Sequence, residues 1–124
     1  KMHKKNQLTS WVILCLLFFS LSVLGQKSTR YERLTTASGL SQNTINKIIQ
    51  DKKGFLWFAT ADGLNRYDGY SYEVYRHDPS DPKTLSGSDI STVTEDDEGN
   101  LWVGTRNAGL NKLDLKKTLK ANNI

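Results

Sequence analysis

Acidic residues that could bind a metal or transfer protons recur at one spacing in this chain of 124 residues. Asp51 and Asp96 lie 45 positions apart and could serve as paired acids or as calcium ligands. A calcium-binding loop needs oxygen ligands at alternate positions and a closing Glu, which residues 99–101 (Gly-Asn-Leu) do not supply. In both places Gly follows the Asp by three positions, which is typical of a tight turn whose amides bond the carboxylate and whose Gly takes φ > 0. We interpret both acids as turn caps and predict no metal site.

Two tryptophans, Trp57 and Trp102, are spaced in the same way. An indole ring can stack on the C–H face of a pyranose, so either tryptophan could bind a sugar. Each lies at the same place in an apolar run, LWFAT or LWVGT, that has the length of a buried strand. We therefore predict that both pack between β-sheets.

No set of residues in the chain predicts catalysis. His77 could be a metal ligand or a general base, but the other histidine, His3, lies in an N-terminal segment that we expect to be removed. A single His in a Pro-containing loop is better interpreted as a loop residue. The sequence offers no Ser/His/Asp set at a credible spacing, no glycine loop for phosphate and no zinc spacing. We predict no catalytic residue, no cofactor and no enzyme activity.

The spacing of the acids and tryptophans belongs to an internal repeat. Over 27 aligned positions, with one inserted residue, 12 residues are identical, whereas unrelated segments would share about two. The identical pairs are Leu40/Leu85, Ser41/Ser86, Ile45/Ile90, Asp51/Asp96, Gly54/Gly99, Leu56/Leu101, Trp57/Trp102, Thr60/Thr105, Gly63/Gly109, Leu64/Leu110, Asn65/Asn111 and Asp68/Asp114.

Each copy of the repeat has the pattern of short strands joined by tight turns. We predict strands over 44–50, 55–60, 63–67 and 71–75, and again over 90–95, 101–105 and 109–113. In the second strand of each copy, the residues that point to each of the two faces include apolar ones. Both faces of its sheet must therefore be covered by other parts of the protein. Four strands every 45 residues are typical of the blades of a β-propeller. The expected fold is all-β, with about two four-stranded blades in an incomplete ring.

We divide the chain into five segments. They are a signal peptide (1–25), an N-terminal strand (26–38), the first propeller repeat (39–83), an incomplete second repeat (84–114) and a basic tail (115–124). The second repeat lacks the aromatic residues that follow Asp68 in the first, so no fourth strand is predicted there. A closed ring needs at least about four blades, so we expect the chain to be part of a longer protein or to associate with copies of itself. In a longer parent the N-terminal strand, around Tyr31–Thr35, would complete the last blade.

The first 25 residues have the layout of a secretory signal peptide. Positive residues end at Lys5, a run of 14 mostly apolar residues extends from Trp11 to Leu24, and the small residue Gly25 follows. As a helix this run would span about 21 Å, which is short of the ~30 Å hydrocarbon core of a membrane. We therefore expect cleavage after Gly25 and a periplasmic location.

Charge and cysteine content limit the partners of the remaining chain. The 17 basic and 13 acidic residues give an excess of +4, but three of the positive charges lie in the signal peptide, so the rest carries only +1. A nearly neutral domain does not favour nucleic-acid binding. The single cysteine, Cys15, is also in the signal peptide, which leaves no thiol for a disulfide. We expect membrane contact only through regions beyond this chain.

The repeated residues resemble the two-component regulator propeller repeat. That repeat is typified by GLS followed by DxxGxLWxxTxxGLNxYD, and the first copy matches it from Gly39 to Asp68. The linker from His77 to Pro82 also resembles the connection between blades in this family. The resemblance covers about residues 31–114.

The resemblance implies the periplasmic sensor region of a hybrid two-component system, of the kind found mostly in Bacteroidetes, that detects glycan fragments. We therefore expect a non-enzymatic segment that binds an oligosaccharide. Two alternatives remain open: a structural or protein-interaction propeller, and a propeller enzyme such as a lyase or glycosidase, because a fold does not determine function.

Ligand specificity is expected where the two copies differ, because turns and packing explain the repeated positions. The differing residues lie in the connections between strands: Gln42 and Asn43 against Gly87 and Ser88, and Ala61 and Asp62 against Arg106, Asn107 and Ala108. Connections on a rigid scaffold commonly present binding groups. Arg106 and Asn107 carry donors suited to sugar hydroxyls or uronate carboxylates, so they are the candidate ligand-binding residues.

The signal-peptide layout predicts that the exported protein begins at Gln26. N-terminal sequencing of protein recovered from the periplasm of an expressing cell should give Gln-Lys-Ser-Thr. A chain that retains Met2 and sediments with the membranes would contradict the prediction.

Overall fold

The computed structural model describes residues 3–19, 25 and 27–117, in two units that divide between Glu32 and Arg33. The first unit contains helix α1 (His3–Phe19), which covers part of the predicted apolar run. Residues 20–24 and Gln26, at the predicted cleavage site, lie outside the described ranges. Within those ranges no helix is long and apolar enough to cross a membrane.

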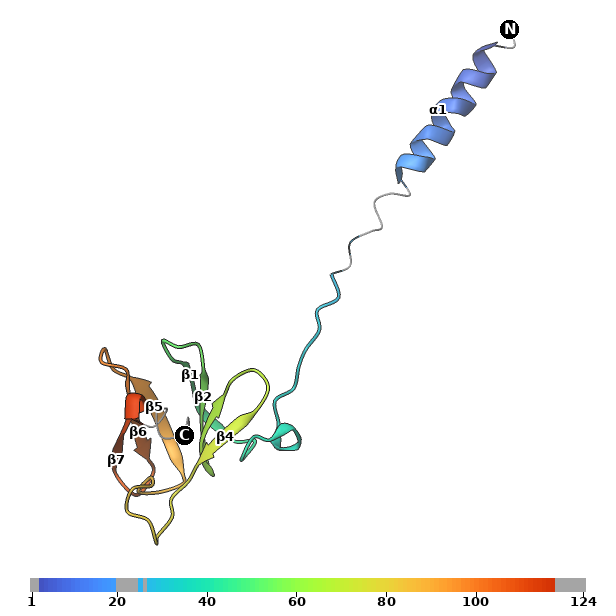
Figure 1. The fold of residues 1–124 in the computed structure, drawn as a ribbon. Coiled ribbons are helices and arrows are strands. Elements are labelled where there is room, and N and C mark those ends of the chain that lie inside the picture. Colours follow the sequence, from blue (N-terminus) through green and yellow to red (C-terminus); the bar gives the residue numbers. More distant parts are fainter. Residues whose placement is uncertain (1–2, 20–24, 26, 118–124) are drawn as a thin grey trace. The chain divides into compact units, whose positions relative to one another are not determined.

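The second unit consists of two antiparallel sheets in which strands adjacent in sequence pair with each other (Figure 1). The first sheet contains β1 (Ile45–Gln50), β2 (Leu56–Thr60), β3 (Gly63–Tyr67) and β4 (Tyr72–Tyr75). The second contains β5 (Ile90–Glu95), β6 (Asn100–Thr105) and β7 (Leu110–Asp114). The predicted all-β fold and strand positions are confirmed to within about two residues at each end. As expected, the described part of the second repeat has three strands, and a helical turn at 115–117 follows β7.

Within residues 27–38, the described part of the N-terminal strand predicted over 26–38, no strand is formed. Residues 27–35 have no helix or strand, and the 3₁₀-helix η2 (Thr36–Ser38) follows them. A strand requires a partner edge for its backbone hydrogen bonds. The expectation that this segment completes a blade therefore stays a prediction.

Asp51 caps the turn between β1 and β2, as its spacing to Gly54 predicts. Its Oδ1 accepts hydrogen bonds from the amides of Lys53 (2.9 Å) and Phe55 (3.0 Å), and Gly54 has φ 93°. Its Oδ2 accepts a third bond, from Nε1 of Trp57 at 2.8 Å. The carboxylate is 5% exposed, so it fixes the turn and the orientation of the indole from one buried position.

The second repeat reproduces this arrangement around Asp96. Its Oδ1 accepts bonds from the amides of Glu98 (3.0 Å) and Asn100 (2.8 Å), and its Oδ2 accepts a bond from Nε1 of Trp102 (2.9 Å). The Asn100 side chain, the Asn100 amide and the Trp102 indole hold the pKa of this carboxyl well below its usual range. These bonds therefore stabilise the fold while Asp96 is ionised, and their contribution is lost as the pH falls through the lowered pKa.

The two sheets pack face to face around the first tryptophan. Trp57, Ala59 and Leu64 share one face of the first sheet by strand register, and they lie in one fully buried cluster with Leu101 and Val103 of the second sheet. The prediction that Trp57 packs between sheets is confirmed.

Trp102 occupies the equivalent face of the second sheet and is half-buried, since no further sheet covers it within the described residues, so its packing between sheets stays a prediction. The Lys112 ammonium lies 5.3 Å from its ring centroid, a distance at which a cation attracts an aromatic face.

Hydrogen bonds also connect the sheets at both ends. At the turn end, the Lys52 amide donates to Glu95 Oε2 (2.9 Å), and its Nζ donates to the carbonyls of residues 96–97 (3.1 and 3.0 Å). At the opposite end, the Gly63 amide donates to the Ser88 carbonyl (2.6 Å). The two blades are thus joined at each end of their shared core.

The repeated Ser and Asn residues form a side-chain clasp that the sequence analysis did not anticipate. The Ser41 amide donates to Asn65 Oδ1 (2.9 Å), Asn65 Nδ2 donates to Ser41 Oγ (2.7 Å), and Ser41 Oγ lies 3.0 Å from Thr60 Oγ1. In the second repeat Ser86 and Asn111 form the same reciprocal pair at 3.0 and 2.8 Å. The clasp holds the segment before the first strand onto the third strand of each blade.

The three bonds to Asp51 predict a large effect for a nearly isosteric change. In Asp51→Asn, an amide that still accepts the two turn bonds presents an NH₂ group to the indole N–H, so two donors face each other in a buried site. We expect a loss of about 2 kcal/mol in the free energy of unfolding, measured by urea denaturation. Asp97→Asn, at an exposed position in the turn of the second repeat, is the control, and an equal small effect of both changes would contradict the assigned role.

Candidate binding surface at the loop end

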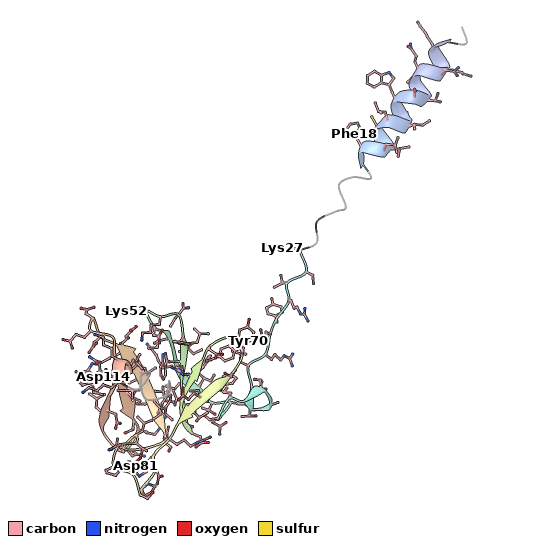
Figure 2. All side chains as sticks on the ribbon, viewed as in Figure 1. Phe18, Lys27, Lys52, Tyr70, Asp81 and Asp114 are labelled. Atoms are coloured by element: carbon pink, nitrogen blue, oxygen red, sulfur yellow. The ribbon has the colours of Figure 1, made fainter. Side chains whose placement is uncertain are left out.

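The candidate residues gather at one end of the two sheets, which we call the loop end. The pairs Ile45–Thr60 and Ile90–Thr105 lie at this end, so the segments before β1 and β5 lie beside the connections that leave β2 and β6. The opposite end carries the capped turns. In Figure 2 the labelled Asp81 lies near the loop end, and the labelled Lys52 lies in a capped turn at the opposite end.

Arg106 is fixed at the loop end by Asp89. Its Nε donates to Asp89 Oδ2 (3.0 Å), and its amide donates to the Asp89 carbonyl (2.9 Å). The side chains are 58% and 41% exposed. In the first repeat Thr44 and Ala61 hold the same positions and keep only the backbone bond, at 3.4 Å. The ion pair therefore distinguishes the second repeat from the first.

Sequence reasoning missed Asp89, although strand register could have found it. In an antiparallel hairpin the residue before the first strand lies opposite the residue after the second. Since Ile90 pairs with Thr105, Asp89 must face Arg106. The other carboxylate oxygen, Asp89 Oδ1, is buried and accepts no hydrogen bond from the described protein atoms.

Asn107 and Ala108 complete the bend after β6. Asn107 is exposed beside Arg106. Ala108 closes over Gly87, where an added Cβ would lie 2.9 Å from the Ala108 Cβ. The structure thus brings the two candidate residues, Arg106 and Asn107, together on an exposed bend with a tightly packed base.

A second ion pair at the loop end joins Asp62 to Arg76. The Arg76 guanidinium donates from Nε to Oδ1 (3.2 Å) and from its terminal nitrogen to Oδ2 (3.1 Å), so the contact is bidentate. Both side chains are about half exposed. Arg76 was not predicted as a site residue, but it directly follows β4 and so lies beside the connection that contains Asp62.

Other predicted loop residues form local bonds. Gln42 Oε1 accepts a bond from the Asn43 amide (2.6 Å), and Asn43 Oδ1 accepts one from Thr36 (3.0 Å). His77 donates its amide to Ser88 Oγ (3.0 Å), and its Nδ1 lies 2.6 Å from the Leu85 carbonyl. The interpretation of His77 as a loop residue is confirmed, and Gln42, Asn43 and Ser88 support the loops.

The loop end therefore presents guanidinium donors and carboxylate acceptors on a fixed base. Such groups can bind hydroxyls and carboxylates through charge-assisted hydrogen bonds. Within residues 3–19, 25 and 27–117, no group of three or more His, Cys, Asp and Glu side chains could hold a metal ion. The arrangement is suited to recognition of a polar ligand.

Comparison with known proteins identifies the repeats. The sequence profile described as "Two component regulator propeller" matches residues 39–62 and 84–107, which confirms the resemblance. Histidine kinase P4 of Formosa agariphila is 44% identical over 70 residues, which are 56% of this chain and 5% of that protein.

A solved structure has the same fold. It is the extracellular domain of a hybrid two-component system from B. thetaiotaomicron, with 36% identity and a TM-score of 0.64. The match covers 69% of this chain and 12% of that chain. The chain thus spans a small part of both proteins.

The exposure of Arg106 predicts that it contributes little to folding. Since exposed ion pairs contribute about 0–1 kcal/mol, Arg106→Ala should lower the free energy of unfolding by less than about 1 kcal/mol. Gly63→Ala should cost more, because Gly63 has φ 108° and an added Cβ would lie 2.7 Å from the Tyr75 carbonyl. Chemical denaturation compares the two variants, and an equally large loss in Arg106→Ala would make Arg106 a structural residue.

Proposed function

We propose that this chain, whose residues 39–62 and 84–107 belong to the two-component regulator propeller family, forms part of the sensing propeller of an exported signalling protein. The similarity to an extracellular domain of a hybrid two-component system supports this role. The positively charged start, the apolar run and Gly25 support export to the periplasm.

The observation that carries the proposal is the separation of repeated and variable residues. The repeated side chains cap turns, fill the core or clasp the strands, as Asp51, Trp57 and Asn65 do. The variable residues Asp62, Arg106 and Asn107 lie at the loop end instead. A scaffold that repeats its turn caps and its Ser–Asn clasps and differs in its loop-end residues is suited to binding.

The chemistry of the loop end favours a saccharide that carries hydroxyl or carboxylate groups. Arg106 contacts Asp89 through Nε, and with 58% of its side chain exposed it keeps donors available to a ligand. Asn107 adds an amide that can both donate and accept. We therefore assign the chain a glycan fragment as ligand and binding without bond cleavage.

Calorimetry with a panel of neutral and uronate-containing oligosaccharides tests the assignment on the whole chain. Binding without product formation is expected, and the double variant Arg106→Ala/Asn107→Ala should weaken it by about tenfold or more, as expected when charge-assisted bonds are lost. The matched control is Lys116→Ala/Lys117→Ala, which removes exposed donors outside the loop end.

Three outcomes would contradict the proposal. Turnover of any sugar in the panel would favour the enzyme alternative. Capture of a protein ligand with no response to sugars would favour the interaction alternative. Unchanged sugar affinity in the loop variant would remove Arg106 and Asn107 from the site.

A further inference from the structure

The two ion pairs at the loop end lie close to each other across the contact between the blades. Asp62 follows β2 of the first sheet, and Asp89 leads into β5 of the second. The Gly63 amide donates to the Ser88 carbonyl (2.6 Å), so one hydrogen bond joins the residues next to the two acids. The bond lengths along this path place the Cα atoms of Asp62 and Asp89 within about 10 Å of each other. Both pairs are therefore close enough to contact one short oligosaccharide.

Each guanidinium in these pairs is already bound to a carboxylate. Arg76 binds both oxygens of Asp62 (3.2 and 3.1 Å), and Arg106 binds Asp89 through Nε (3.0 Å). A guanidinium has five N–H donors, so each keeps some that a ligand can use. The four side chains are between 41% and 58% exposed. The loop end thus presents donors and acceptors side by side, with the charge of each pair balanced.

The charge of the surrounding connections is slightly negative. Residues 41–44, 61–62, 76–89 and 106–109 form the loop end, and with His77 neutral they carry four carboxylates against three cations. The carboxylates are Asp62, Asp78, Asp81 and Asp89, and the cations are Arg76, Lys83 and Arg106. An anionic ligand therefore gains no net attraction from this surface.

A ligand carboxylate would meet one of two costs at Arg106. If it binds beside Asp89, two negative charges share one guanidinium and repel each other. If it displaces Asp89, that side chain loses the one hydrogen bond that it accepts from the described protein atoms, because its Oδ1 is buried and accepts none. A partly buried carboxylate without a donor is unfavourable. A sugar hydroxyl avoids both costs, because it carries no charge and leaves the ion pair intact.

We propose that the loop end selects neutral saccharides over uronates, with each ion pair binding two adjacent hydroxyls of a sugar. The carboxylate accepts a hydrogen bond from one hydroxyl, and the guanidinium donates to the oxygen of its neighbour. Adjacent hydroxyls of a pyranose present a donor and an acceptor side by side, as the two partners of each pair do. This inference rests on the proposed function and narrows its ligand to an uncharged glycan fragment.

Calorimetry on the full chain with matched ligands tests the selection. The ligands are an oligogalacturonide with its fully methyl-esterified form, and an oligomannuronide with the corresponding oligomannoside. In each pair that binds, the neutral member should bind about tenfold more tightly, because Asp62 and Asp89 do not repel it. Its affinity should change little when sodium chloride is added, because no net charge is neutralised. Tighter binding of the charged member would overturn this inference and leave the proposed function standing.

Removal of the two carboxylates tests their role directly. Asp62→Asn/Asp89→Asn keeps the size of both side chains, and it should weaken binding of the neutral member roughly fivefold and strengthen binding of the charged member. Asp97→Asn, at an exposed position in a capped turn at the opposite end, is the matched control and should leave both affinities unchanged. Circular dichroism of each variant verifies that the sheets remain folded.

Two results of this comparison would count against the inference in different ways. An unchanged preference for the neutral member in the double variant would remove Asp62 and Asp89 from the selection and overturn the inference alone. Absence of binding to every ligand by the unaltered chain would overturn the proposed function and this inference with it.

Discussion

The fold of each blade depends on one carboxylate, which is buried in the first blade and partly exposed in the second. Asp51 connects the turn amides to the indole of Trp57 through its two oxygens. A buried carboxylate is stable only when its oxygens are bonded, so the turn, the indole orientation and the strand between them are determined together. The face that Trp57 presents is the face on which the second sheet packs. The same carboxylate–indole pair in the second repeat, Asp96 with Trp102, orients the side chain that the next sheet surface would meet.

Much of this fold could be predicted because its signals are local. Alternating apolar residues located the strands, and the spacing from Asp51 to Gly54 located the turn. The bond from Asp51 to Trp57 was missed because turn patterns describe backbone amides and do not reveal a side chain six residues away. At the loop end, Arg106 was found as a difference between repeats, but its partner Asp89 required the strand register. The segment around Tyr31 was predicted as a strand from its sequence, yet strand structure depends on a partner edge that local sequence does not supply.

In each repeat, the side chains that cap the turns and clasp the strands are the same, whereas residues at the loop end differ. The clasp between Ser41 and Asn65, like the turn cap, is formed by the same residue types in both repeats. The loop end is built on this support, so an ion pair such as Asp89–Arg106 can be present in one blade and replaced by Thr44 and Ala61 in the other while the backbone bond is kept. Residues there are able to change with little effect on the sheets beneath them.

The bonds that join the two blades at both ends have a mechanical consequence. Lys52 holds the turn end, and the Gly63 amide holds the loop end, on either side of a fully buried core. These three attachments restrict rotation of one blade against the other, because such a rotation would strain the hydrogen bonds or open the core. A force applied at the loop end of one blade is therefore expected to displace both blades together.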